Sequence, residues 1–230
     1  MQTIVDNSGD DTAKTLADRV FAVLQDDIVL GRIAPGSKLG EAELAARFGI
    51  SRGPLREAIQ RLESRKLLKR IPHVGCRVAE LSLDQLIEVY QLRELLEGEA
   101  ARLAASAMTD EEVAKLRELL AQHEQQQDLQ ADEAYFQHEG DLDFHYRIIQ
   151  GSHNATLANL LMGELYYLVR MYRYQASQAR ARPQRAFGEH RAILAAIEAR
   201  DGEMAQLLMR RHLARARAHL QQQQAEEEQR

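Results

Sequence analysis

Residues 41–56 have the sequence EAELAARFGISRGPLR, in which two short helical segments flank a glycine. The first segment, 41–48, carries an apolar stripe, and Gly49 is the residue type that ends helices with a positive φ. Ser51 is a favourable N-cap for the second segment, and Pro54 is tolerated in its first turn. A helix, a tight glycine turn and a capped helix together predict a helix-turn-helix.

The sequence on either side of this motif predicts a winged helix-turn-helix. Before the motif, apolar residues recur at spacings of three and four from Thr15 until Gly31. After the motif, short runs at Leu68–Ile71 and Cys76–Ala79 flank a turn that contains proline and glycine, which predicts a β-hairpin, or wing. We therefore expect a DNA-binding domain over residues 13–80.

The remainder of the chain has a helical pattern and no further strand signal. Good helix formers dominate a composition that is 45% hydrophobic and 5% aromatic. We therefore expect a mainly α protein, with a mobile tail over 1–12 and an all-α antiparallel bundle of six to seven helices over 81–225. The expected helices cover 82–106, 109–128, 131–151, 154–180, 184–200 and 202–224.

The charge distribution favours a nucleic-acid partner, although the whole chain carries a net charge of −5. Between Arg47 and Arg77 there are nine basic residues and two acidic ones, Glu57 and Glu63. Such a cluster would attract phosphate, and a solvated basic helix face is the alternative.

Cysteine usage and the absence of long apolar runs bear on the compartment. The single cysteine, Cys76, excludes a disulfide framework within the chain and fits a reducing environment. With no signal-peptide pattern and no membrane-length apolar run, we expect a cytoplasmic protein that does not contact a membrane.

The start of the second helix of the motif is the expected base-reading surface. Arg52 and Arg56 lie four residues apart and project from one face of a helix. Arginine is the side chain best suited to pair with O6 and N7 of guanine, and Gly53 lets the backbone approach the groove. The expected DNA contacts are Ser51, Arg52, Gly53, Pro54 and Arg56 at the bases, and Arg47, Lys69, Arg70, His73 and Gly75 at the phosphates and the neighbouring groove.

About 65 residues around this motif resemble the GntR family of bacterial regulators. The resemblance is carried by IAPGSKL at 33–39, by EAELAARFGISRGPLREA at 41–58 and by the wing. It implies that the base-reading residues are Ser51, Arg52, Pro54 and Arg56, with the wing tip at His73–Gly75. Many relatives have arginine where this chain has Ala42, so the operator is expected to differ from the family's commonest one.

One pair of residues in the helical half has the spacing of metal ligands. Asp141 and His145 are four residues apart and therefore stack on one helix face. A carboxylate and an imidazole suit a divalent metal, whereas an ordinary intrahelical pair explains the spacing equally well.

Residues 88–216 resemble FCD, the C-terminal ligand-binding domain of the FadR-type subfamily. The matching stretches are VYQLRELLEGEAARLAA, GDLDFHYRIIQGSHNATL and FGEHRAILAAIEARDGEMAQLLMRRHL. The resemblance implies a divalent metal, with zinc favoured over nickel or manganese. The implied ligands are Asp141, His145, His190 and His212.

A metal with cationic neighbours would suit a small organic acid as effector. Arg93 lies on the inward face of its predicted helix and could clamp a carboxylate, although an intrahelical pair with Glu97 is the alternative. Arg170 and Tyr167 are further candidates for the pocket. The FCD resemblance implies organic-acid effectors, among which we favour a di- or tricarboxylate of central metabolism.

Together these observations predict a homodimeric repressor whose affinity for double-stranded operator DNA is controlled by the organic acid. A metalloenzyme using the same histidines is the rival class, but no catalytic motif accompanies them. An architectural DNA binder with a structural metal is a third possibility.

Overall fold

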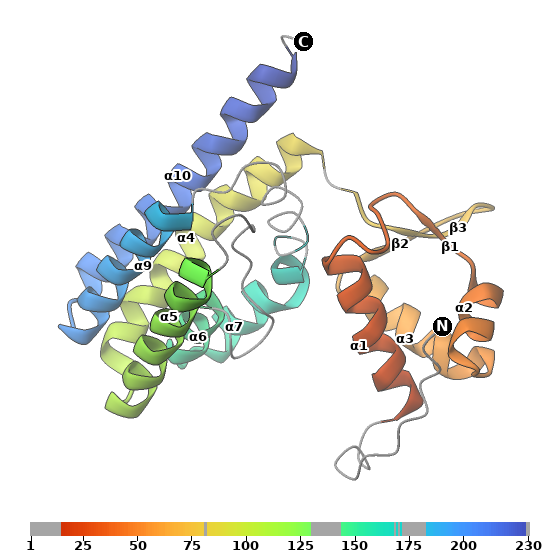
Figure 1. Ribbon diagram of the computed structural model, residues 1–230, viewed down its shortest axis with the longest axis horizontal. Coiled ribbons are helices and arrows are strands. Elements are labelled where there is room, and N and C mark those ends of the chain that lie inside the picture. The colour runs from red at the N-terminus through yellow and green to blue at the C-terminus, as the bar shows by residue number, and fades with distance from the viewer. Residues whose placement is uncertain are drawn as a thin grey trace. The chain divides into compact units, whose positions relative to one another are not determined.

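The computed structural model describes residues 15–80, 82–129, 144–167, 169, 171 and 183–228. The chain divides at Glu80 into two compact units (Figure 1). The expected tail at 1–12 and the expected helical stretches at 131–143 and 172–180 lie outside the described residues.

The first unit has the expected winged helix-turn-helix architecture. Its elements are α1 (Leu16–Val29), β1 (Lys38–Leu39), α2 (Glu41–Phe48), α3 (Arg52–Ser64), β2 (Leu68–Ile71) and β3 (Gly75–Val78). Helix α1 begins at Thr15, whose hydroxyl accepts from the Asp18 backbone amide in a capping box. Helix α2 ends at Gly49 with a φ of 63°, the left-handed conformation that allows the sharp turn into α3.

The wing contains one strand more than the hairpin that the sequence predicts. All three strands are antiparallel in the order β1-β3-β2, and Leu39 of β1 pairs with Cys76 of β3. Two residues are too short for a pairing pattern to be visible in the sequence. The wing tip is a turn in which Pro72 precedes His73 at a φ of 63°, and the Val74 amide donates to the Ile71 carbonyl, as in a type II turn.

The apolar faces of the three helices meet in one core. Leu24 and Ile28 of α1 and Leu55, Ile59 and Leu62 of α3 are fully buried. Cys76 also lies in the core, where burial raises the pKa of its thiol to about 11. This thiol is therefore a small apolar filler of the core.

Helices are the only regular secondary structure among the described residues of the second unit. Its elements are α4 (Leu83–Ala107), α5 (Asp110–Leu129), α6 (Phe144–Gly151), α7 (Ala155–Leu160), the π-helical turn η2 (Leu161–Leu165), α9 (Pro183–Glu198) and α10 (Gly202–Glu228). Helix α4 begins at Ser82 with a capping box, as the sequence pattern suggests. One difference from expectation is that the helix expected over 154–180 passes at Leu161 into a π-helical turn, since apolar spacing does not distinguish the two helix types over so few residues.

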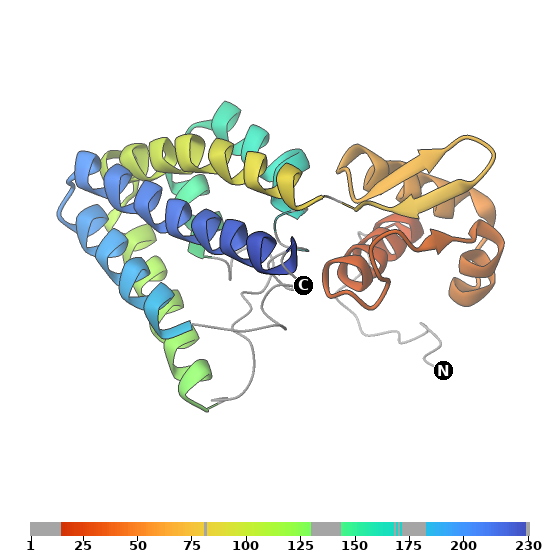
Figure 2. The same ribbon diagram turned by 90° about the horizontal axis from the view of Figure 1, so that it is seen from above.

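The two longest helices, α4 and α10, run antiparallel alongside each other (Figures 1 and 2). Arg217 of α10 donates to Glu94 in the middle of α4, while Gln206, closer to the start of α10, donates to Glu99 further along α4. Gly98 permits the approach, because a Cβ there would lie 2.6 Å from Cγ of Arg210. The pair α4 and α10 is the frame on which the candidate site of this unit is built.

In the part of the chain that the structure describes, no helix combines the length and the apolar character needed to cross a bilayer.

Candidate DNA interface and candidate metal centre

The N-terminal turn of α3 is exposed while the rest of the helix is anchored in the core. Ser51, Arg52 and Gly53 are exposed, and Pro54 is half-buried. Ser51 occupies the N-cap position in an extended conformation (φ −74°, ψ 165°), but its hydroxyl makes no capping hydrogen bond with the described residues. Ser51 therefore contributes its extended backbone conformation to the start of α3. Its hydroxyl does not cap the helix, whereas that of Thr15 caps α1.

The opposite side of α3 is held against α1. Nη1 of Arg61 lies 2.6 Å from Oδ1 of Asp18, and its guanidinium covers the Phe21 ring at 4.3 Å. The hydrogen bond from Arg61 lowers the pKa of Asp18 to about 2. Arg65 also lies over this ring, with its Cζ 4.6 Å from the centroid. Arg61 and Arg65 therefore hold α3 against α1, while the N-terminal turn of α3 stays exposed.

Arg56 and Arg70 share one carboxylate partner, Glu41. Nε of Arg56 donates to Oε2 of Glu41 at 3.0 Å, and Nη1 of Arg70 lies 3.5 Å from the other oxygen of Glu41. Arg70 also donates from Nε to Glu63 at 3.0 Å. The hydrogen bond from Arg56 is the main cause that lowers the pKa of Glu41, with Arg70 adding to it.

Arg47 is likewise paired within the unit. Its Nη2 lies 2.8 Å from Oδ2 of the buried Asp27, whose other oxygen accepts from Arg32 at 2.6 Å. The excess of basic residues between 47 and 77 is therefore partly neutralised by Asp18, Asp27 and Glu41. Sequence reasoning missed these partners because they lie outside the basic window.

The remaining predicted DNA contacts lie on the wing. Lys69 is exposed on β2, His73 is exposed at the turn, and Gly75 begins β3 with a φ of 104°. Only glycine adopts that backbone conformation readily, so Gly75 has a structural reason to be glycine whether or not it approaches DNA.

In the second unit, three helices bring His145, His190 and His212 together. His145 lies on α6, His190 on α9 and His212 on α10, and one ring nitrogen from each falls within 4.8 Å of the others. Nε2 of His190 and Nε2 of His212 are 3.4 Å apart. His145 and His190 are buried, and Phe144 stacks on the His190 ring at 4.4 Å. Of the four predicted metal ligands, Asp141 lies outside the described residues.

Two of the three imidazoles are oriented by carboxylates. Nδ1 of His145 lies 2.7 Å from Glu97, and Nδ1 of His212 lies 2.7 Å from Glu189. An ionised carboxylate accepts a hydrogen bond from Nδ1–H, and in that neutral tautomer Nε2 has a lone pair that can bind a metal. The sequence contained no signal for Glu189, since its link to His212 joins two helices.

An arginine stands behind each of these carboxylates. Nε of Arg93 lies 2.5 Å from Oε1 of Glu97, and Nη1 of Arg215 lies 2.7 Å from Oε1 of Glu189. Burial raises the pKa of Glu97, but Arg93 and then His145 outweigh it and hold that pKa well below its usual value. Burial likewise opposes ionisation of Glu189, and hydrogen bonds from His212 and Arg215 produce a net lowering of its pKa. Both carboxylates are therefore anionic acceptors at neutral pH.

Of the three predicted effector contacts, Arg93 and Tyr167 are buried in the second unit, and the third is not among the described residues. Arg93 forms the intrahelical pair with Glu97 that was the alternative in the sequence, and its side chain is only 6% exposed. Tyr167 is buried with its ring against Tyr166, and Tyr166 in turn contacts Tyr146 of α6. Arg170 lies outside the described residues.

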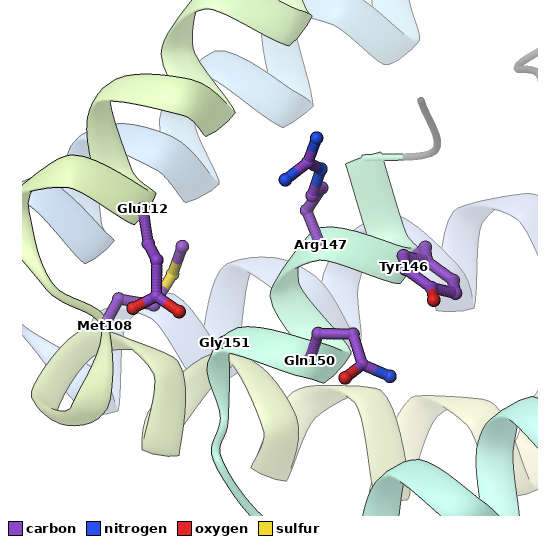
Figure 3. Close-up of a pocket in the computed structure, with 6 residues that line it drawn as sticks. All are labelled: Met108, Glu112, Tyr146, Arg147, Gln150 and Gly151. Atoms are coloured by element: carbon purple, nitrogen blue, oxygen red, sulfur yellow. The ribbon is translucent and has the colours of Figure 1, made fainter. Parts of the chain in front are cut away.

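A pocket of about 200 Å³ lies between the start of α5 and α6 (Figure 3). It is lined by Met108, Glu112, Tyr146, Arg147, Gln150 and Gly151. At about 100° per residue, Arg147 and Gln150 lie roughly 140–160° around α6 from His145. This pocket therefore lies on the side of α6 turned away from the three histidines and is distinct from their site.

Residues 16–78 match the family described as bacterial regulatory proteins, gntR family, and residues 88–215 match the FCD domain. The chain belongs to the GntR family of regulators. Its members are DNA-binding transcription regulators and not enzymes, which excludes the metalloenzyme alternative.

Individual relatives agree with this assignment. This GntR regulator is 37% identical over 123 residues to the Nta operon transcriptional regulator of Aminobacter aminovorans, covering 54% of this chain and 57% of that one. It is 30% identical to the HTH-type transcriptional repressor RspR of Escherichia coli, covering 85% and 84% of the two chains. The solved structure of E. coli McbR/YncC is similar with a TM-score of 0.72 at 26% identity, over 91% of this chain and 99% of that one.

Proposed function

We propose that this GntR regulator is a repressor whose N-terminal unit binds operator DNA and whose C-terminal unit binds a divalent metal and a small organic acid. The observation that carries the ligand-dependent part is the convergence of three histidines from three helices. Two of them are oriented by a carboxylate that is itself bound to arginine. Membership of the GntR family carries the DNA-binding part.

In the first unit, Arg52 and Arg56 would read base edges and the wing would contact the backbone. Both arginines are exposed and lie one helical turn apart on a helix whose other side is buried. Ser51, Gly53 and Pro54 at the start of α3 would also lie at the bases, and Gly53 would let the backbone approach the groove. Arg47, Lys69, Arg70, His73 and Gly75 would position the unit without reading sequence.

The donor set of the second unit fits a divalent metal. Three imidazoles, two of them with Nδ1 held by a carboxylate, suit zinc, nickel or manganese, and Asp141 would supply a fourth ligand. When bound, the metal would supply an open coordination position that accepts a carboxylate oxygen.

A small organic acid, with a di- or tricarboxylate favoured, would bind beside that metal. Arg93 is the residue through which such an acid could act at a distance, because its guanidinium reaches a metal ligand through Glu97 and then His145. A carboxylate that draws Arg93 away from Glu97 would alter the orientation of His145 on α6. Arg170 and Tyr167 remain candidates for the walls of this site.

The repressor role rests on similarity to the E. coli repressor RspR. A repressor of this kind releases its operator only if the effector binds one arrangement of the protein better than the other.

We further propose that the protein acts as a homodimer through the outer face of α4. Leu92 and Leu95 lie one turn apart on that helix and are 50% and 57% exposed. Large apolar side chains so exposed on one helix face are typical of interfaces. Light scattering after gel filtration should give twice the 26.1 kDa chain mass, and Leu92→Gln with Leu95→Gln should shift this to the single chain.

Leu160 on α7 is 58% exposed and provides the matched control for the dimer. Leu160→Gln removes about as much exposed apolar surface as either single substitution on α4 and should leave the dimer intact. A monomeric wild-type protein, or an equal shift with Leu160→Gln, would contradict this interface.

A thermal-shift screen tests the sensing role. Di- and tricarboxylates, monocarboxylates and neutral polyols are added to metal-free protein and to protein loaded with zinc, nickel or manganese. A ligand present at about 100 times its Kd stabilises by about 2.7 kcal/mol, which raises the Tm of a domain of this size by roughly 5–10 °C. The expected hit is a carboxylate that acts only with metal present and that also lowers operator affinity, since coupling is reciprocal. Stabilisation by polyols alone, or a hit that leaves operator affinity unchanged, would contradict the proposal.

A further inference from the structure

We propose that Glu41 is a positioning residue that orients Arg56 for base recognition. This role rests on the proposed function of α3 in reading operator bases. Discrimination between the correct base pair and others, at the position that Arg56 reads, would then depend on Glu41, a residue outside α3. Glu41 begins α2 and is separated from Arg56 by the turn at Gly49.

Both oxygens of Glu41 are engaged by different basic side chains. Oε2 accepts from Nε of Arg56 at 3.0 Å, and Oε1 lies 3.5 Å from Nη1 of Arg70. The Glu41 side chain is 26% exposed, whereas that of Arg56 is 63% exposed. The carboxylate is thus fixed between α3 and β2, and the guanidinium that it holds extends into solvent.

The atom that Glu41 contacts decides what Arg56 can still do. An arginine pairs with O6 and N7 of guanine through two N–H donors of its planar fork. Because Glu41 takes the Nε donor, the terminal Nη1 and Nη2 edge remains for the base. Holding the other end of the side chain also reduces the rotamer freedom that Arg56 loses when it binds.

The negative charge of Glu41 has a second effect, because it lowers the affinity of the protein for non-specific DNA. A carboxylate close to the duplex repels phosphates and weakens binding to any sequence. Positioning strengthens binding only where the correct base is present. Glu41 should therefore raise the ratio of specific to non-specific affinity in two ways. It strengthens specific binding by positioning Arg56, and it weakens non-specific binding by repelling phosphates.

Arg52 supplies the internal comparison. Within the described ranges it forms no ion pair, although it is exposed on the same helix. Discrimination at the base pair read by Arg52 should therefore not depend on Glu41.

The test begins with a duplex selected from a randomised pool by the full-length wild-type protein. Arg56→Ala and Arg52→Ala each identify the base pair at which discrimination is lost. Dissociation constants are then measured for the selected duplex, for duplexes substituted at each of those base pairs, and for a non-specific duplex.

Glu41→Ala should lower discrimination at the Arg56-dependent base pair by about 10-fold, a large part of what one bidentate contact provides. It should leave discrimination at the Arg52-dependent base pair unchanged and raise non-specific affinity by about 2- to 3-fold. Glu41→Gln keeps an acceptor oxygen and should recover part of the lost discrimination. Glu43→Ala removes an exposed carboxylate from the same turn of α2 and should change only the non-specific affinity.

In an Arg56→Ala background, Glu41→Ala should have no further effect on discrimination, because the side chain that it positions is gone. The proposal is overturned if Glu41→Ala reduces discrimination equally at both base pairs, if its effect persists without Arg56, or if Glu43→Ala reproduces it. If Arg56→Ala itself leaves discrimination intact, the proposed DNA-reading role of α3 fails too. An Arg56 effect without a Glu41 effect overturns the positioning role alone.

Discussion

Replacing Arg52 and Arg56 together with alanine should lower affinity for a selected operator duplex by about 100- to 1000-fold. Each bidentate contact to a guanine contributes about 1–3 kcal/mol of discrimination, and the two side chains project from the same exposed face of α3. Affinity for unrelated duplex DNA should fall far less, because much of that binding comes from phosphate contacts elsewhere on the unit. Fluorescence anisotropy with both duplexes at one salt concentration measures the two effects.

Lys69→Ala is the matched control, since it removes one exposed positive charge from the wing. It should weaken binding to all sequences alike and reduce the salt dependence of log K by about one phosphate contact. If the Arg52/Arg56 double variant binds its operator as tightly as the wild type does, α3 does not read bases in this protein.

Replacing His190 with alanine should lower the affinity for a divalent metal by at least about 100-fold. His190 is fully buried at the meeting point of the three imidazoles, and a histidine ligand lost from a preformed site is not replaced by water without a large cost. Competition titration of metal-free protein with zinc, nickel and manganese measures the change.

Two further variants separate a metal ligand from its neighbours. Glu189→Gln keeps the shape of the side chain that orients His212 but removes its charge, and should cost about 10- to 100-fold in metal affinity. His219→Ala removes an exposed histidine two turns further along α10 and should leave metal affinity unchanged. Equal losses for His190→Ala and His219→Ala would indicate surface binding rather than a centre at the three histidines.

The two halves of this protein were predictable from the sequence to different extents. In the first unit, glycine, serine and proline occur at the positions where the backbone must turn, so the order of helices and the hairpin follow from local chemistry. The Gly49 turn and the Pro72–His73 turn are examples. Strand β1 was not predictable, because a two-residue strand has no pattern and exists only through its pairing with β3.

For the candidate metal centre, the sequence predicted which residues are the ligands but not how they meet. Nothing in the spacing of His145, His190 and His212 indicates that they meet, and family resemblance supplied that expectation. The structure brings them together and adds Glu97, Glu189, Arg93 and Arg215 behind them. Three of these four contacts join different helices, and helical periodicity describes only which side of one helix a residue occupies.

The sequence by itself determined where this chain turns and which faces of its helices are apolar, because both depend on residues that are close in the sequence. Its motifs also identified the family. Only the tertiary structure decided how the charges are used. It pairs Arg47 with Asp27, Arg61 with Asp18 and Arg56 with Glu41, and so limits the basic surface left for DNA. The physical reason is that an ion pair needs a distance of a few ångströms, and for residues 15 to 43 positions apart only the packing of helices sets that distance.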